Sequence, residues 1–300
     1  MIVLLNDFFI FLIYLFIISS MLSIGFGLSL KDITDSLKRK GLLCRSLFLN
    51  LILIPFAALL TAYLLSLSGP VLFGFLAMAC APGASYAPRI TEVSNGDVGH
   101  STGLMFILCT IAVFSSPFTL MLVLPGANSI NPWSVIQTLA IIQMLPLFLG
   151  MFLRIKAPKI SRKFSEISFW TSNISALIVI SVSLYVIFMR ESQGGFFSVI
   201  IGTFGVLAII ISVLFSFALG FIFGGDTSEE KKSLAISSVN RNAGVAFLIA
   251  VSSILMNAQI LIMIIIYIIV QSLVSGGFAG FWFWKDYKDG KKTILSKEKK

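Results

Sequence analysis

The sequence carries few charged residues. They make up 12% of its 300 residues, whereas a soluble domain usually carries about 25%. A water-facing surface cannot be built from so few charges. The chain instead contains repeated apolar stretches of twenty or more residues. Each is long enough to cross a hydrocarbon core of ~30 Å at a helical rise of ~1.5 Å per residue. The composition therefore excludes an ordinary soluble domain and predicts an integral membrane protein.

Residues that carry most enzyme and metal chemistry are also scarce. The chain has three cysteines and a single histidine, His100. The cysteines show neither metal-ligand spacing nor a disulfide framework. There is no H-E-x-x-H motif and no pair of aspartates within an apolar segment, so we predict neither an enzyme nor a cofactor. His100 is expected near a helix start, which makes it a weak candidate for a proton carrier. We interpret the cysteines as small buried apolar residues: Cys44, Cys80 and Cys109.

The apolar stretches divide into nine segments. Helices are predicted for all of them, because a backbone in lipid must satisfy its polar groups internally. The alternating segments of ~10 residues that build a β-barrel are absent. The predicted fold is therefore all-α, with nine transmembrane helices in one membrane domain over residues 1–300. The segments lie at about residues 8–30, 41–67, 70–95, 98–124, 132–155, 165–189, 196–224, 230–254 and 257–284.

The basic residues predict an orientation. They gather at alternate connections and in the C-terminal tail, whereas the connections on the other side carry only Arg190. The net charge of +9 thus reflects the positive-inside rule rather than a nucleic-acid partner. We predict a multi-pass protein of the inner (plasma) membrane, with its N-terminus outside and a basic cytoplasmic tail at 285–300. The basic residues concerned are Lys31, Lys38, Arg39, Lys40, Arg45, Arg154, Lys156, Lys159, Arg162, Lys163, Lys231, Lys232, Lys285, Lys288, Lys291, Lys292, Lys297, Lys299 and Lys300.

Two segments should be broken in the middle. The third contains Pro82, Gly83 and Pro88, and the eighth contains the polar run from Ser237 to Asn242. Prolines break helices. Interrupted segments at corresponding positions of two halves mark the binding site of secondary transporters. The two breaks are five crossings apart, so they enter the membrane from opposite sides. We therefore predict inverted repeats, with four helices at about 8–124 (the first helix absent) and five at about 132–284.

Several short motifs resemble the bile acid:sodium symporter family. They occur in the order in which that family has them, and the resemblance runs over about residues 20–280. It implies a core domain in which two broken helices cross, a panel domain, and an organic anion bound between the two. Family members with nine helices lack the first helix of the ten-helix form. The matching residues are 25–30 (GFGLSL), Asn50 before Pro55, 80–84 (CAPGA), 95–97 (NGD) and 241–244 (RNAG).

The chain departs from the family at its sodium ligands. Where the family has Ser-Asn after the first break, this chain has Ala87 and Pro88, which offer no side-chain oxygen. Ser237 stands for a family glutamate, and Arg241 for a glutamine at the second break. A guanidinium ~6 Å from a sodium ion, at an effective dielectric of about 20, repels it by roughly 3 kcal/mol. Sodium binding is possible at these positions but is disfavoured.

We hypothesise that Arg241 and Arg89 take over the electrostatic role of sodium and bind an anionic substrate, because arginine suits carboxylate, sulfate or phosphate. Arg89 could instead reach water from a helix end or pair with Glu92. Amides within apolar segments, such as Gln143, Asn173 and Gln271, are interpreted as interhelical hydrogen-bonding groups. No metal-ligand set is assigned. The candidate substrate-binding residues are Arg241, Asn242, Asn240, Arg89, Ser85, Tyr86, Ser237 and Asn50.

The predicted function is secondary active transport of a small organic anion by alternating access. Three alternatives are kept: a sodium-coupled symporter with non-standard ligands, a channel, and a membrane receptor for a small anion. A channel would need a filter-like motif or a ring of charge, and neither is visible. A receptor would more naturally be fused to a signalling domain. The predicted partners are the organic anion and the lipid bilayer, with no nucleic acid; the oligomeric state is not predicted.

Overall fold

The computed structural model describes residues 2–123, 131–189, 203–252 and 257–290, and every element in these ranges is helical. Two π-helical turns join successive helices: Leu49–Leu53 between α3 and α4, and Ala140–Met144 between α8 and α9. The helices are α1 (Ile2–Gly27), α2 (Leu30–Lys38), α3 (Lys40–Phe48), α4 (Ile54–Leu64), α5 (Gly69–Ala79), α6 (Ala87–Val93), α7 (Val98–Val123), α8 (Pro132–Leu139), α9 (Leu145–Lys156), α10 (Pro158–Met189), α12 (Gly205–Phe223), α13 (Ser228–Val239), α14 (Ala243–Ser252) and α15 (Ala258–Lys288).

The all-α membrane architecture is confirmed. Among the described residues, eight helical stretches are long and apolar enough to cross a membrane. The predicted third segment is divided into two shorter helices, α5 and α6, and the eighth is divided between α13 and α14. The count of nine crossings and the inverted repeats stay predictions. The expected loop at 31–40 is wrong in part, because most of it forms α2, whose N-cap Ser29 accepts a hydrogen bond from the N–H of Lys31 at 3.2 Å.

Two further boundaries differ from the prediction. Helix α10 starts at Pro158 rather than near 165, because proline suits the first turn of a helix and the charged residues after it continue that turn. Helix α15 extends to Lys288, past the predicted end of the ninth segment at 284, and the cytoplasmic tail at 285–300 stays a prediction. Residues 291–300 lie outside the described part of the chain, as does the predicted start of the seventh segment at 196.

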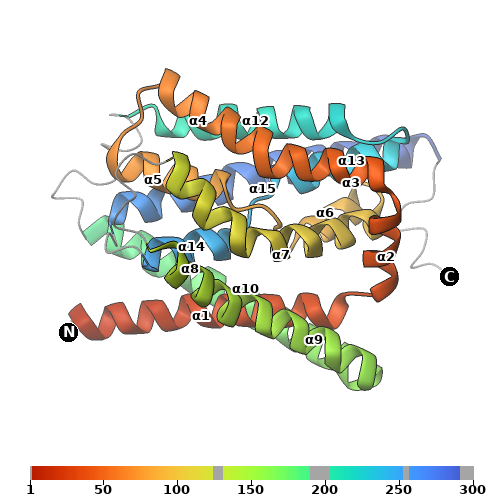
Figure 1. Cartoon of the computed structure of the whole chain (residues 1–300), viewed down its shortest axis with the longest axis horizontal. Coiled ribbons are helices and arrows are strands. Elements are labelled where there is room, and N and C mark those ends of the chain that lie inside the picture. The colour runs from red at the N-terminus through yellow and green to blue at the C-terminus, as the bar shows by residue number, and fades with distance from the viewer. Residues whose placement is uncertain (1, 124–130, 190–202, 253–256, 291–300) are drawn as a thin grey trace.

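The helices form two groups (Figure 1). In the first, α1 packs along α9 and α10. Gly25 of α1 and Gly150 of α9 make this contact close, because a Cβ atom on Gly25 would lie 2.3 Å from the carbonyl oxygen of Leu147. Small residues of this kind let membrane helices approach each other. The second group holds the four half-helices α5, α6, α13 and α14 with α4, α7, α12 and α15.

An ion-pair cluster ties several helix ends of the second group together. The guanidinium of Arg39, between α2 and α3, donates to the carboxylates of Asp97 and, at 3.2 Å, of Glu230. Burial would raise the pKa of Asp97, but the N–H of His100 and the guanidinium of Arg39 outweigh it, so that pKa lies below its ordinary value. The pKa of Arg39 is raised, first of all by its hydrogen bond to Asp97. The turn before α7 is thus fixed to the start of α13.

A second ion pair, which is buried, includes Lys232, which lies near Glu230 of the first cluster in the sequence. The ammonium of Lys232 in α13 donates to the Asp286 carboxylate of α15 at 2.7 Å and to the carbonyl oxygen of Ser94 at 2.9 Å. The amide of Asn95 donates to the same carboxylate oxygen at 3.2 Å. Both charged side chains are less than a tenth exposed. The ends of α6, α13 and α15 therefore meet in one hydrogen-bonded cluster.

Breaking this buried pair on one side should be costly. Lys232→Met removes the ammonium group that donates to the buried Asp286 carboxylate, and we expect a loss of about 3 kcal/mol of stability. Adding Asp286→Asn, which removes the buried negative charge as well, should recover most of the loss. Thermal unfolding of the detergent-purified single and double variants measures both. If the double variant is no more stable than the single one, the carboxylate is not the origin of the cost.

Candidate functional site

The two broken helices meet in the middle of the second group. Figure 1 shows α5 and α14 toward one end and α6 and α13 toward the other. The backbone N–H of Asn242, in the second break, donates to the carbonyl oxygen of Ala81 in the first break at 2.7 Å. The Asn242 side-chain amide donates to the carbonyl oxygen of Gly83 at 3.2 Å. Each break therefore supplies hydrogen-bond partners that the other would lack, as an interrupted helix within a membrane requires.

Glycine at position 83 is required by both conformation and space. Its φ of +88° lies in the region that favours glycine. A Cβ atom there would lie 2.7 Å from the backbone nitrogen of Cys109 in α7. The Cys109 thiol donates to the carbonyl oxygen of Gly83 at 2.8 Å, and the amide of Gln143 donates to the Cys109 carbonyl at 3.1 Å. Helix α7 thus closes directly against the first break.

Gln271 of α15 supports the second break. Its side-chain oxygen accepts the backbone N–H of Arg241 at 2.9 Å, and its amide nitrogen donates to the Arg241 carbonyl at 3.4 Å and to the hydroxyl of Tyr86. Ser275, one turn later, donates to the side-chain oxygen of Asn240 at 3.2 Å. The interhelical role expected for Gln271 is confirmed, but its position within one long apolar segment does not assign it to the site. Ser275 was not predicted at all.

The guanidinium of Arg241 is fully buried. Its Nη1 donates to the backbone carbonyl of Asn50 at 3.4 Å, at the π-helical turn between α3 and α4. Its Nε and Nη2 atoms have no hydrogen-bond partner in the described parts of the chain, nor has the side-chain oxygen of Asn50. Arg241 belongs to none of the ion pairs formed by the described residues. The site thus holds a buried positive charge that no carboxylate of the described residues pairs with.

A chain of neutral hydroxyls lies beside the crossing. The hydroxyls of Ser237 in α13 and Ser101 in α7 are 3.1 Å apart, and the hydroxyl oxygen of Thr91 in α6 lies 3.1 Å from that of Ser101. Thr91 donates to the carbonyl oxygen of Ala87 at 2.9 Å. Ala87 and Pro88 continue as the first turn of α6. Three hydroxyls from three helices therefore come together where the sequence lacks the family's glutamate and Ser-Asn.

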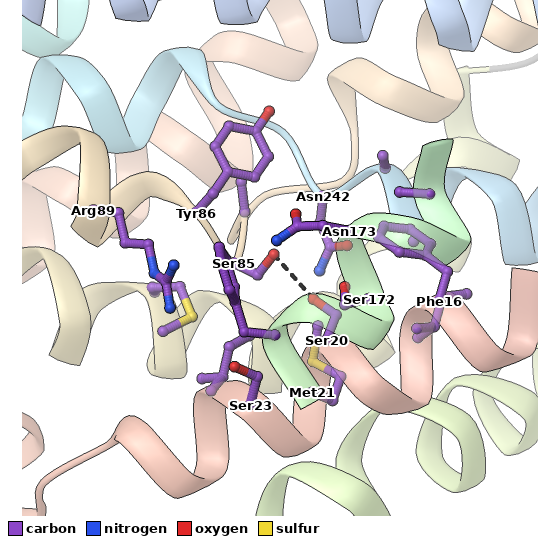
Figure 2. Close-up of a pocket in the computed structure, with 18 of the residues that line it drawn as sticks. Phe16, Ser20, Met21, Ser23, Ser85, Tyr86, Arg89, Ser172, Asn173 and Asn242 are labelled. Carbon is purple, nitrogen blue, oxygen red and sulfur yellow. Dashed lines mark hydrogen bonds between the residues drawn. The ribbon is translucent and has the colours of Figure 1, made fainter. Parts of the chain in front are cut away.

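A cavity of about 370 Å³ lies between the two helix groups. Figure 2 shows Ser20, Met21 and Ser23 of α1 on one side and Ser85 and Tyr86 of the first break on the other. The hydroxyl of Ser20 donates to that of Ser85 at 3.1 Å. None of the described residues that line the cavity is acidic, and two of them are arginines. Its apolar wall includes Phe16, Ile17, Met21, Met105, Phe169, Val179, Ile180, Phe247 and Ile268.

The structure separates the eight candidate residues into two sets. Five line the cavity, and the other three are buried behind the crossing. In that second set, Asn50 donates to Ser238 at 3.3 Å, Asn240 donates to its own helix, and Ser237 contacts Ser101. These three hold the breaks rather than face the cavity. The five lining residues are Arg241, Asn242, Arg89, Ser85 and Tyr86, but the fully buried guanidinium of Arg241 donates to the Asn50 carbonyl oxygen of the second set.

Arg89 connects the two helix groups across the cavity. Its guanidinium carbon lies 3.4 Å from the ring centroid of Phe169 in α10. This is a cation–π contact between α6 and the first helix group. Arg89 and Glu92 do not form the ion pair that the sequence left open, at least within the described chain. The Arg89 side chain is exposed and lines the cavity, so its N–H groups are available to a ligand.

Substitution at Gly83 tests the crossing. Gly83→Ala places a Cβ atom against α7 and forces alanine to positive φ, which costs about 1–2 kcal/mol before any clash. We expect a lower melting temperature in detergent. The matched control is Gly277→Ala in α15, where a Cβ atom has open space within 4 Å and alanine favours the helix by up to ~1 kcal/mol. Equal melting temperatures for the two variants would contradict the close packing at the first break.

Comparison with protein families supports the motif resemblance. The family model described as the Sodium Bile acid symporter family matches residues 13–222, more than two thirds of the chain. The match includes the second half of α1, the first break and α10, and it ends before the second break. None of the curated proteins compared with the chain matched it. The match shows the family, and with it a transporter in a multi-pass membrane setting rather than an enzyme. The chain therefore belongs to the sodium bile acid symporter family of membrane transporters.

Proposed function

We propose that the chain is a secondary active transporter that carries a small organic anion by alternating access, with Arg241 as a fixed positive charge in place of a sodium ion. The observation that carries this proposal is the buried guanidinium at the second break, with no carboxylate paired to it in the described chain. A buried charge without a counter-ion costs several kcal/mol. An anion bound near the crossing offsets that cost, whereas a sodium ion there increases it.

The cavity suits an anion with an apolar body. Its apolar wall can cover a hydrocarbon skeleton, and Asn242, Ser20 and Ser85 offer polar contacts at the crossing. Arg89, on the other side of the cavity, presents a guanidinium that can bind a carboxylate or sulfate through two N–H groups. Sites of this kind are mostly apolar, with a few polar groups that fix the orientation of the ligand. The absence of acidic side chains among the described lining residues favours negative charge.

Alternating access needs two rigid parts that can move against each other. The hydrogen bonds of Asn242 to Ala81 and Gly83 join the two breaks, so they move as one unit. Across the cavity, two polar contacts between described residues of this unit and of α1 and α10 are the Ser20–Ser85 hydrogen bond and the Arg89–Phe169 contact. Both contacts would have to break when the cavity opens to the opposite side of the membrane. Each contact includes a residue that a bound anion could contact instead.

A sodium-coupled symporter is the second candidate, and one observation favours it. The hydroxyls of Thr91, Ser101 and Ser237 come together beside the crossing, and hydroxyl oxygens can bind a cation. All three are neutral. Without a carboxylate they give a weaker cation site than the family's glutamate would. We therefore place this candidate below the sodium-independent transporter.

Sodium dependence can be tested without a known substrate. We expect the parent protein in detergent to melt at the same temperature in sodium and in potassium chloride, and an organic anion to stabilise it equally in both. A ligand at 100 times its dissociation constant adds ~2.7 kcal/mol to the free energy of unfolding. That increase is large enough to shift the melting temperature measurably. The panel should include bile acids and short carboxylates. Stabilisation in sodium alone would overturn the role given to Arg241.

The variant Arg241→Gln removes the fixed charge and keeps a polar side chain. Loss of roughly 2 kcal/mol of charge attraction should weaken anion binding about thirtyfold, and the melting temperature should become sensitive to sodium. Arg45→Gln, which removes an exposed arginine whose hydrogen bond within the described residues is to Gly41 of its own helix, is the matched control. If Arg241→Gln binds anions as well as the parent, the guanidinium does not attract the substrate.

Transport itself separates a carrier from a channel and a receptor. In proteoliposomes, an anion that stabilises the protein should enter with saturable kinetics, and uptake of labelled anion should rise when unlabelled anion is inside. A channel would show no such counterflow. A receptor would bind the anion and show no flux. Both outcomes would leave the family assignment in place and reject the proposed transport cycle.

A further inference from the structure

A second hollow, of about 390 Å³, lies at the end of the first helix group, apart from the crossing. It is formed where α1 and α9 end and α10 begins. Arg154, in the last turn of α9, donates to the carbonyl oxygen of Phe26 at 2.9 Å, and Ser161 donates to the same oxygen at 3.3 Å. These bonds fix the floor of the hollow. Arg162, Ser165 and Glu166 of α10 complete its lining, together with Gly27 and Pro158.

The segment beside this hollow is rich in basic residues, and the lining itself holds Arg154 and Arg162 together with the acidic Glu166. Residues 154–166 contain five basic side chains and one acidic one, Glu166. None of the five takes part in an ion pair within the described chain. The start of α10 adds the positive end of a helix dipole, and Ala157 before it offers no side-chain cap. The basic residues are Arg154, Lys156, Lys159, Arg162 and Lys163.

The surface beside the hollow is apolar. Exposed large side chains follow the outer faces of α9 and α10 next to the basic residues, on the same few turns. The positive-inside rule accounts for basic loops in general, but it does not require an open hollow with two arginines in its lining that borders an apolar face. A headgroup above acyl chains has this pattern of charge and apolar surface. The exposed apolar residues are Phe152, Leu153, Ile155, Ile160, Phe164 and Ile167.

We propose that this hollow binds the phosphate-bearing headgroup of an anionic phospholipid from the adjoining leaflet. Arg162 and Arg154 face the phosphate, and the acyl chains lie along the apolar faces of α9 and α10. Basic pockets between membrane helices bind such headgroups. Free phosphate has the same charge but gains nothing from the apolar face, so the lipid is the better ligand. Gly27 and Ser165 line both hollows, which places the headgroup at the edge of the central cavity.

Lipid titration of the purified chain tests this site. Thermal unfolding in detergent should be followed with added phosphatidylglycerol, with phosphatidylcholine, and with free glycerol phosphate. We expect only phosphatidylglycerol to raise the melting temperature. Arg162→Gln should shift the half-maximal lipid concentration upward about fivefold, the effect of one basic contact at a lipid surface. Arg162 is exposed and has no partner in the described chain, so this variant should fold normally.

The control is Arg45→Gln, which removes an exposed arginine outside the hollow and should respond to lipid like the parent. Three results would overturn the proposal. The first is equal stabilisation by phosphatidylcholine, which shows a general lipid effect. The second is equal stabilisation by glycerol phosphate, which shows a soluble-anion site. The third is an Arg162→Gln variant with the lipid response of the parent, which places the lipid elsewhere. None of these results bears on anion transport through the central cavity.

Discussion

The hydrogen bond from the Asn242 backbone N–H to the Ala81 carbonyl oxygen joins the two broken helices. A helix that stops inside a membrane leaves backbone groups without partners, and each such group costs several kcal/mol in lipid. Because the two breaks lie against each other, backbone groups of one can bond to the other. Gln271 supplies partners for the backbone N–H and carbonyl of Arg241 in the second break. The identity of Gly83, the position of α7 and the position of α15 all follow from this contact. So does the cavity, because irregular backbone at that depth lines a space between helices.

The buried guanidinium of Arg241 changes what this crossing can do. A sodium ion that binds and leaves can couple transport to an ion gradient, whereas an arginine side chain cannot leave. A fixed charge can hold the broken helices and attract an anion, but it supplies no driving force of its own. Under the proposed function, net accumulation would then depend on the gradient of the anion, or on another ion bound elsewhere. The neutral hydroxyls of Thr91, Ser101 and Ser237 are oxygens beside the crossing that could take such an ion.

The sequence predicted the parts of this structure that depend on local chemistry. Pro82 and Gly83 marked the first break because their backbone limits are intrinsic, and the polar run at Asn240–Asn242 marked the second. Which side chain faces the cavity depends on rotation about a helix that has already been interrupted, and no periodicity predicts that. Asn50, Ser237 and Asn240 were therefore grouped with the cavity residues, although they lie behind the crossing. Pairings such as Lys232 with Asp286 join residues far apart in sequence, and charge alone does not choose between possible partners.

Arginines lie at both hollows and at the crossing of the broken helices. Arg154 and Arg162 lie at the outer hollow, Arg89 lines the central cavity, and Arg241 lies at the crossing. Since Gly27 and Ser165 belong to both hollows, an anion could meet positive charge at each stage from the edge of the molecule to its centre. Long-range attraction of this kind raises association rates, and salt weakens it. An anionic headgroup in the outer hollow would offset part of that charge, so the lipid composition would change the rate of anion entry more than the affinity at the crossing.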